Sequence, residues 1–186
     1  MPTPATVRAF GWAAGLAMAP ALGCAALAAP PQPSLEAAVK ATYLYKLGAF
    51  IDWPASAFDG PAAPLRLCVA GDDPFGALLD QAVRGQSITG RPISVTRVDH
   101  VARGVACQIL FIAGSGSQPV AEALAEVRGS PVLTVTDGAQ DPAARGIVDF
   151  VVKDNRVRFL IDAAAAGQAE LAISSKLLSL SLRAER

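Results

Sequence analysis

Two nearly unbroken apolar runs limit the fold of this chain more than any other feature of its sequence. They occupy residues 107–113 and 131–135, and turn-forming residues follow each of them. Runs of this kind are typical of β-strands covered on both faces, as in a parallel sheet between helices. A shorter run at 65–70 and the alternating apolar residues of 93–98 predict two more strands.

Helical segments separate these strands along the chain. We expect one helix between the turn at residues 71–74 and Val83, and a second from the turn at 114–117 through Val127. The order strand, helix, strand, strand, helix, strand indicates a mainly parallel sheet covered by helices. The sequence therefore predicts an α/β fold with three layers and a Rossmann-like sheet.

The two ends of the expected domain depart from this alternation. Ser34 is a candidate N-cap for a helix that runs to about Phe50. Residues 147–152 and 156–161 flank a short polar turn and predict a C-terminal β-hairpin. We expect a further helix over residues 163–169, and a short edge strand and a terminal helix between residues 171 and 182.

The first of these helices has an apolar stripe with helical spacing, which we expect to face the core. The stripe consists of Leu35, Val39, Tyr43, Leu47 and Phe50. Tyr45 lies off the stripe, so we expect its side chain to be exposed to solvent.

The N-terminal thirty residues have a different composition from the rest of the chain. Residues 10–29 are apolar and rich in alanine, with glycines and Pro20 interrupting them, and small residues end the segment before two prolines. This pattern predicts a cleaved signal peptide over residues 1–29 and a single exported domain over 30–186, located in the periplasm. A retained membrane anchor and a lipid-modified Cys24 are the alternatives.

Composition excludes two classes of protein. The chain has 16 basic and 16 acidic residues, whereas a nucleic-acid-binding protein normally has a basic face that neutralises phosphates. It has one histidine and three cysteines, too few for a zinc finger. We therefore expect no nucleic-acid partner, no metal and no cofactor.

Removal of the signal peptide leaves Cys68 and Cys107 as the only cysteines. The exported protein reaches an oxidising compartment, and the first and third strands of a doubly wound sheet are commonly neighbours. We therefore expect a redox-sensitive disulfide between the two. The alternative is a pair of buried free thiols that pack as small apolar side chains.

A search for catalytic motifs finds none. A Ser-His-Asp triad would require His100, and no serine stands in a Gly-x-Ser-x-Gly motif. Asp72, Asp73 and Ser115 follow two of the expected strands, so they are candidates for ligand binding in a cleft at the strand ends. Helix capping by the aspartates and a plain strand-to-helix turn at Ser115 are the structural alternatives. We therefore expect the protein not to be an enzyme.

Short motifs along nearly the whole expected domain resemble the YfiR family of periplasmic regulators. In chain order they are residues 39–47 (VKATYLYKL), 50–54 (FIDWP), 68–71 (CVAG), 73–76 (DPFG), 90–93 (GRPI), 107–112 (CQILFI), 131–137 (PVLTVTD), 156–159 (RVRF) and 173–178 (ISSKLL). The chain departs from the family after the last strand motif. There it has Leu160-Ile161-Asp162 in place of the frequent Glu-Ile-Asn.

The resemblance implies a regulator that binds the periplasmic sensory domain of an inner-membrane diguanylate cyclase. Such a protein represses cyclic di-GMP synthesis and thereby biofilm formation, and its relatives suggest a homodimer. We expect the contact with the cyclase to involve Tyr45 and, on the hairpin, Phe150, Arg158 and Leu160. A periplasmic small-molecule sensor that acts on another membrane receptor is the alternative function.

Overall fold

The structure is a computed structural model that describes Met1 and residues 34–182. Apart from Met1, the predicted signal peptide, with Cys24, lies outside the described residues. Residues 34–182 belong to one compact unit.

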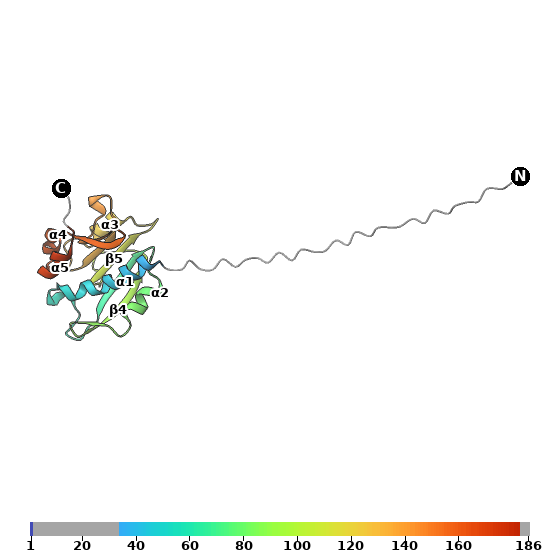
Figure 1. Ribbon diagram of the computed structural model, residues 1–186. Helices are drawn as coiled ribbons and strands as arrows, with labels where there is room; N and C mark the ends of the chain where they lie inside the picture. The colour runs from blue at the N-terminus through green and yellow to red at the C-terminus, as the bar shows by residue number, and fades with distance from the viewer. Residues whose placement is uncertain (2–33, 183–186) are drawn as a thin grey trace. The chain divides into compact units, whose positions relative to one another are not determined.

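A seven-stranded, mostly parallel sheet forms the centre of this unit (Figure 1). Its strand order is β3-β4-β2-β5-β6-β7-β8, and the pairings from β4 to β7 are parallel, whereas β3 and β8 add antiparallel edges. The strands are β2 (Leu65–Gly71), β3 (Ser87–Ile88), β4 (Arg91–Val98), β5 (Ile109–Gly114), β6 (Leu133–Asp137), β7 (Val148–Lys153) and β8 (Arg156–Ile161). The prediction of a mainly parallel α/β sheet is confirmed. The Rossmann-like, three-layer detail stays a prediction.

Short helices and one small additional sheet complete the described part of the chain. The helices are α1 (Leu35–Leu47), α2 (Ala77–Val83), α3 (Val120–Glu126), α4 (Ala163–Gln168) and α5 (Ser175–Leu180). Ser34 caps α1 as predicted, since its hydroxyl accepts a hydrogen bond from the Ala37 amide at 3.1 Å. The second sheet pairs β1 (Ile51–Asp52) with β9 (Ala172–Ile173), and so ties the chain after α1 to the C-terminal segment.

The predicted hairpin is present as β7 and β8, whose register pairs Phe150 with Phe159 and Lys153 with Arg156. Asp154 and Asn155 form the turn with φ of 52° and 56°. This left-handed backbone at both turn residues is the conformation of a tight type I′ hairpin turn.

Two apolar clusters lie on opposite faces of the sheet, because successive residues of β2 point to opposite sides. Leu67 and Val69 belong to the larger cluster, which also takes buried residues from α1, α2, α4 and α5. Cys68 and Ala70 belong to the smaller cluster, to which α3 contributes Ala123. The helices are thus distributed unevenly over the two faces.

The core-facing side of α1 differs from the predicted stripe. Ala41 and Leu44 are fully buried and Tyr45 is 8% exposed, whereas Tyr43 is 38% and Leu35 82% exposed. The prediction was therefore wrong for Leu35, Tyr43 and Tyr45. The small residues explain the difference. A Cβ added at Gly48, just after α1, would lie 3.4 Å from side-chain carbons of Leu65 and Ile109, so the side with Ala41 and Gly48 approaches the sheet most closely.

Candidate functional site

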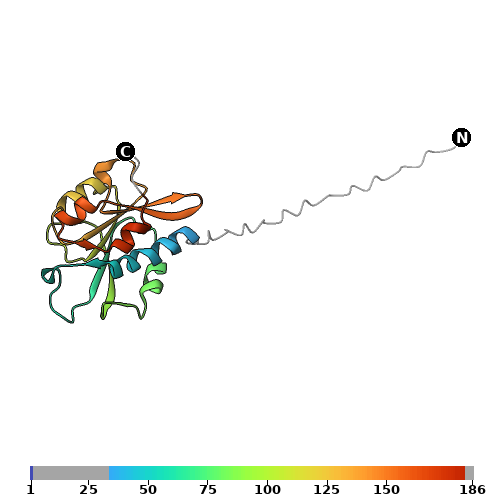
Figure 2. The same ribbon diagram turned by 60° about the vertical axis from the view of Figure 1, so that its left-hand side comes forward.

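Exposed apolar side chains gather between α1 and the β7–β8 hairpin. Leu35 and Tyr43 of α1, Val152 of β7 and Leu180 of α5 are 82%, 38%, 53% and 56% exposed. Figure 2 shows the orange hairpin and the blue α1 extending toward the same side of the molecule, with the dark red α5 beside them. Monomeric proteins rarely leave such side chains together in water, and their grouping indicates an interaction surface.

Two adjoining cavities form a groove along this surface. The larger, of about 540 Å³, lies between the N-terminal half of α1 and the hairpin. The smaller, of about 240 Å³, lies between α1, β8 and α5. Both are lined by Tyr43, Val157 and Arg158, so they form one continuous feature. We call this feature the α1–hairpin groove.

The charged rim of the α1–hairpin groove is basic. Lys46, Arg156 and Arg158 line it, and none of them forms an ion pair with another residue in the part of the chain that the structure describes. Glu36 also lines the groove, and Lys40, with which it forms an ion pair, pairs with Asp137 as well. The groove is therefore lined by apolar side chains and by charged side chains of both signs.

Lys40 fixes the α1 wall of the groove to the sheet. Its side chain is buried, and its Nζ donates hydrogen bonds to Oδ1 and Oδ2 of Asp137 at 2.7 and 2.6 Å and to Glu36. Burial lowers the pKa of Lys40, but the hydrogen bonds and charges of Asp137 and Glu36 outweigh it and raise the pKa above its ordinary value. Since Asp137 ends β6, this cluster ties the first half of α1 to the carboxyl edge of the sheet.

The structure separates the four residues predicted to contact a partner. Arg158 is exposed in the groove, and Leu160 is half-buried on β8 beside Leu182. Phe150 is fully buried and Tyr45 nearly so, because both side chains pack in the larger core cluster. The expectation that Tyr45 and Phe150 form a contact surface is therefore wrong.

Sequence reasoning missed the apolar members of the groove on α1. Leu35, Val39 and Tyr43 were assigned to the core because they repeat every four residues. A signal was available, since α1 is apolar on nearly all sides apart from Glu36, Lys40 and Lys46. A helix with apolar residues all round needs partners on more than one side.

The predicted ligand residues are not brought together. Asp73 accepts hydrogen bonds from the Phe75 amide and from Arg97 Nε, each at 2.7 Å, and Ser115 bonds to Ser117. Asp72 lines a cavity of about 280 Å³ beside the ends of β5 and β6. Ligand binding by these three residues stays a prediction.

The loops after β2 and β5 touch each other at two glycines. Gly71 and Gly114 have φ of 82° and 76°, and a Cβ added to Gly71 would lie 2.2 Å from the Gly114 carbonyl oxygen. The Asp72 amide donates a hydrogen bond to that oxygen at 3.0 Å. This contact fills the point between the two strands where a doubly wound sheet commonly binds its ligand.

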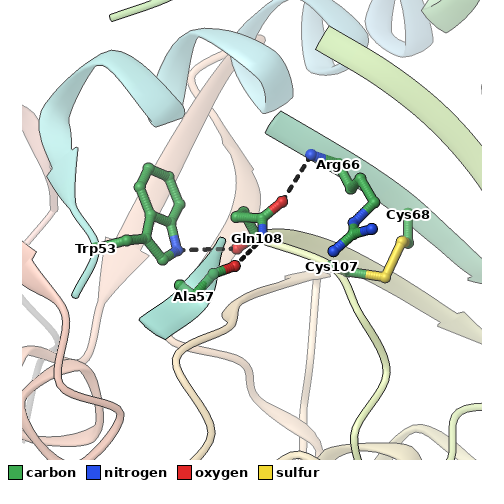
Figure 3. The surroundings of a disulfide bond; sticks show 6 residues. All are labelled: Trp53, Ala57, Arg66, Cys68, Cys107 and Gln108. Atoms are coloured by element: carbon green, nitrogen blue, oxygen red, sulfur yellow. Dashed lines mark hydrogen bonds between the residues drawn. A yellow bond between two sulfur atoms is a disulfide. The ribbon is translucent and has the colours of Figure 1, made fainter. Parts of the chain in front are cut away.

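A disulfide joins Cys68 and Cys107, with their Cα atoms 5.9 Å apart (Figure 3). The predicted neighbouring strands are present, since β2 pairs directly with β5, although Cys107 lies two residues before β5 begins. Gln108, beside the disulfide, accepts a hydrogen bond from the Arg66 amide at 2.7 Å and donates one to Ala57. The backbone carbonyl of Gln108 accepts a third hydrogen bond, from Trp53 Nε1 at 3.2 Å. These bonds fasten the segment after α1 to the sheet.

Two absences apply to the described residues. No helix among residues 34–182 has the length and apolar character needed to cross a membrane. Within the same range, no group of three His, Cys, Asp or Glu side chains is placed to hold a metal ion.

Comparison with known proteins identifies the family. A search of the curated proteins found no match to this chain. The family profile described as YfiR/HmsC-like matches residues 37–182, well over half of the chain. The matched range begins in α1 and ends beside β8, so it contains the seven-stranded sheet, the disulfide and the whole α1–hairpin groove except Leu35 and Glu36. The chain therefore belongs to the YfiR/HmsC-like family.

Proposed function

We propose that the protein is an exported, non-catalytic regulator that binds the periplasmic sensory domain of an inner-membrane diguanylate cyclase and represses cyclic di-GMP synthesis. The YfiR/HmsC-like family is one of periplasmic regulators, and membership supports this reading. The observation that carries the proposal is the α1–hairpin groove, where exposed apolar side chains of α1, the hairpin and α5 gather around two adjoining cavities.

The test measures cyclic di-GMP in cells that lack the protein and in cells complemented with variants. Loss of the protein should raise cyclic di-GMP, and removal of the cyclase as well should abolish the rise. Tyr43→Ser should fail to restore repression while its melting temperature stays close to wild type, because Tyr43 is exposed in the groove. Leu178→Ser is the matched control, since Leu178 is equally exposed at 38% but lines neither cavity of the groove. Unchanged cyclic di-GMP on deletion would refute the proposal.

A small-molecule sensor is the second candidate, and the cavity beside Asp72 favours it. Phe111, Pro74 and Val120 supply apolar surface there, and Asp72 and Thr136 supply polar groups. A ligand that binds the folded state raises the melting temperature with its concentration. A thermal-shift screen with aromatic amino acids and nucleotides tests this candidate, and Ala113→Trp, which would fill the cavity, serves as the control.

A further inference from the structure

The two faces of the projecting β7–β8 hairpin carry different side chains (Figure 2). Phe150 belongs to the larger core cluster and Phe159 packs against it, so both side chains lie on the face toward α1. Successive residues of a strand point to opposite faces, so every second position of β7 and β8 lies on the other face. Three exposed cations occupy that other face, and we call them the basic hairpin face: Lys153, Arg156 and Arg158.

The three cations of the basic hairpin face are close neighbours. Lys153 and Arg156 are direct cross-strand partners beside the turn, and Arg158 is the diagonal neighbour of Lys153. The Cβ atoms of direct partners are about 4.5–5.5 Å apart, and diagonal neighbours are about 7–8 Å apart. Like charges placed directly opposite each other destabilise a hairpin. Such departures from the rules of stable folding are typical of functional surfaces.

The positive charge of the basic hairpin face is not neutralised within residues 34–182, where none of its three members forms an ion pair. Asp149 lies on the same face of β7, but it is 1% exposed. Its carboxylate accepts a hydrogen bond from the Thr136 hydroxyl at 2.7 Å and lies 3.8 Å from Arg145 Nε. The basic hairpin face is therefore free to pair with anionic groups of another molecule.

We infer that the basic hairpin face binds an acidic segment of the partner protein, whose carboxylates pair with Lys153, Arg156 and Arg158. This rests on the proposed function for the identity of the partner, because the segment then belongs to the sensory domain of the cyclase. The charged contact lies on one face of the hairpin, and the α1–hairpin groove offers an apolar contact on the other. Charge complementarity of this kind speeds association and fixes the orientation of the two proteins.

An anionic membrane surface fits the basic hairpin face less well. The turn at the end of the hairpin exposes Asp154, which would meet lipid phosphates with a charge of the same sign. Proteins that bind a membrane surface insert apolar side chains among the headgroups, whereas Val151 and Leu160, the apolar residues of this face, are only half-exposed. Vesicle binding is therefore an outcome that opposes the inference.

The first experiment replaces Lys153 by a photo-cross-linking amino acid in the full-length chain, expressed and processed in cells where repression operates. The two arginines of the basic hairpin face remain in this variant. Cross-linked partner peptides are identified by mass spectrometry. The same cross-linker in place of Gln86, exposed after α2, is the positional control. We expect cross-links from position 153 only, to a segment of the cyclase with a net negative charge.

The second experiment reverses charges on both sides of the contact and measures affinity for the purified domain that contains the cross-linked segment. Arg158→Glu should weaken binding roughly tenfold, because attraction becomes repulsion. Its melting temperature should not fall, since the change removes a like charge from the cluster. Arg84→Glu, at an exposed arginine after α2, should bind like the wild type. Lysine in place of the cross-linked carboxylate residues of the partner should restore binding to Arg158→Glu.

Several results would overturn the inference. They are a neutral or basic cross-linked segment, a cross-link to a second copy of this chain, equal affinities of Arg158→Glu and Arg84→Glu, and binding to phosphatidylglycerol vesicles that Arg158→Glu abolishes. Absence of cross-links from position 153 while repression persists would also overturn it and leave the proposed function standing. An acidic segment from a protein without a cyclase domain would support the charged contact and refute the cyclase as partner.

Discussion

Replacement of Lys40 by methionine tests the idea that one buried cation holds the groove together. Methionine keeps most of the volume of the lysine side chain and removes its charge and its hydrogen bonds. Lys40 is 5% exposed and donates hydrogen bonds to both carboxylate oxygens of Asp137 and to Glu36. The variant therefore leaves two carboxylates facing each other at the junction of α1 and β6.

The expected loss is smaller than for a completely buried ion pair. Removal of one member of such a pair costs about 3–5 kcal/mol. Here the partner side chains keep contact with water, since Asp137 is 33% and Glu36 48% exposed. We therefore expect Lys40→Met to lower the free energy of unfolding by about 2 kcal/mol. In a domain of this size that corresponds to a fall of about 6 °C in melting temperature.

Urea unfolding followed by Trp53 fluorescence measures the loss, with Lys46→Met as the matched control. Lys46 lies on the same helix but is exposed and outside any ion pair of the described residues, so its replacement should change stability by at most about 0.5 kcal/mol. The double variant Lys40→Met/Asp137→Asn should recover part of the loss, because it removes one of the two uncompensated charges. Equal stability of Lys40→Met and Lys46→Met at pH 7 would refute this account.

The pH dependence of the stability difference between wild type and Lys40→Met provides a second test. The pKa of Lys40 is higher in the folded protein than the ordinary value of 10.5. The stabilisation is therefore fully present below the unfolded-state pKa and disappears as the pH rises through the folded-state pKa. The difference between wild type and Lys40→Met should be constant near neutral pH and shrink above about pH 10.5. A difference that grows at alkaline pH would contradict the assignment.

Three further predictions concern covalent and buried features. Loss of the disulfide in Cys68→Ser should lower stability by about 4 kcal/mol in the chain-entropy treatment of a 39-residue separation, as measured by urea unfolding. If the disulfide also controls the regulatory activity, Cys68→Ser should repress cyclic di-GMP synthesis less well than the wild type. Full repression by this variant would exclude a regulatory role of the disulfide. Gln108→Leu should cost about 2 kcal/mol, because the Arg66 amide and the Ala57 carbonyl lose their partner, whereas Gln86→Leu at the surface should not. Intact mass of periplasmic protein should show an N-terminus near residue 29 or 30, and a retained Met1 or a lipid on Cys24 would contradict signal-peptide cleavage.

The sheet was the most predictable part of the fold. The apolar runs at 107–113 and 131–135 contain most of β5 and of β6. Most side chains of these two strands are buried on both faces of the sheet, so their sequences are almost entirely apolar. The hairpin was predictable because a two-residue polar turn lies between two β-rich segments. The two-residue strands β1 and β3 were not predicted, because so few residues show no periodicity. The short strand and the helix expected between residues 171 and 182 are present as β9 and α5.

The candidate site was less predictable, because contacts between distant segments decide it. Phe150 belongs to the hairpin expected to be exposed, yet it is fully buried, since β7 continues into the sheet beside β6 and only the far end of the hairpin projects. Arg158, three residues from the turn, remains in the open and lines the groove. Phe150 and Arg158 therefore differ in burial because they lie at different distances from the turn. The alternation of apolar and polar residues in a strand does not show where the sheet ends.

The error on α1 has the same origin, since the contact with the sheet decides which side of the helix is buried. Hydrophobic periodicity shows that a helix has an apolar face, but α1 has two, and the sheet takes the side with Ala41, Leu44 and Gly48 because small residues permit close approach. The regular stripe of Leu35, Val39 and Tyr43 is then left beside the hairpin. This stripe has the spacing of a core-facing helix but stays exposed after folding. Its removal from water would be favourable, and only binding to another surface can bring that about. The other member of the predicted stripe on α1, Leu47, is buried in the larger cluster, so the stripe passes from the groove into the core along the length of the helix.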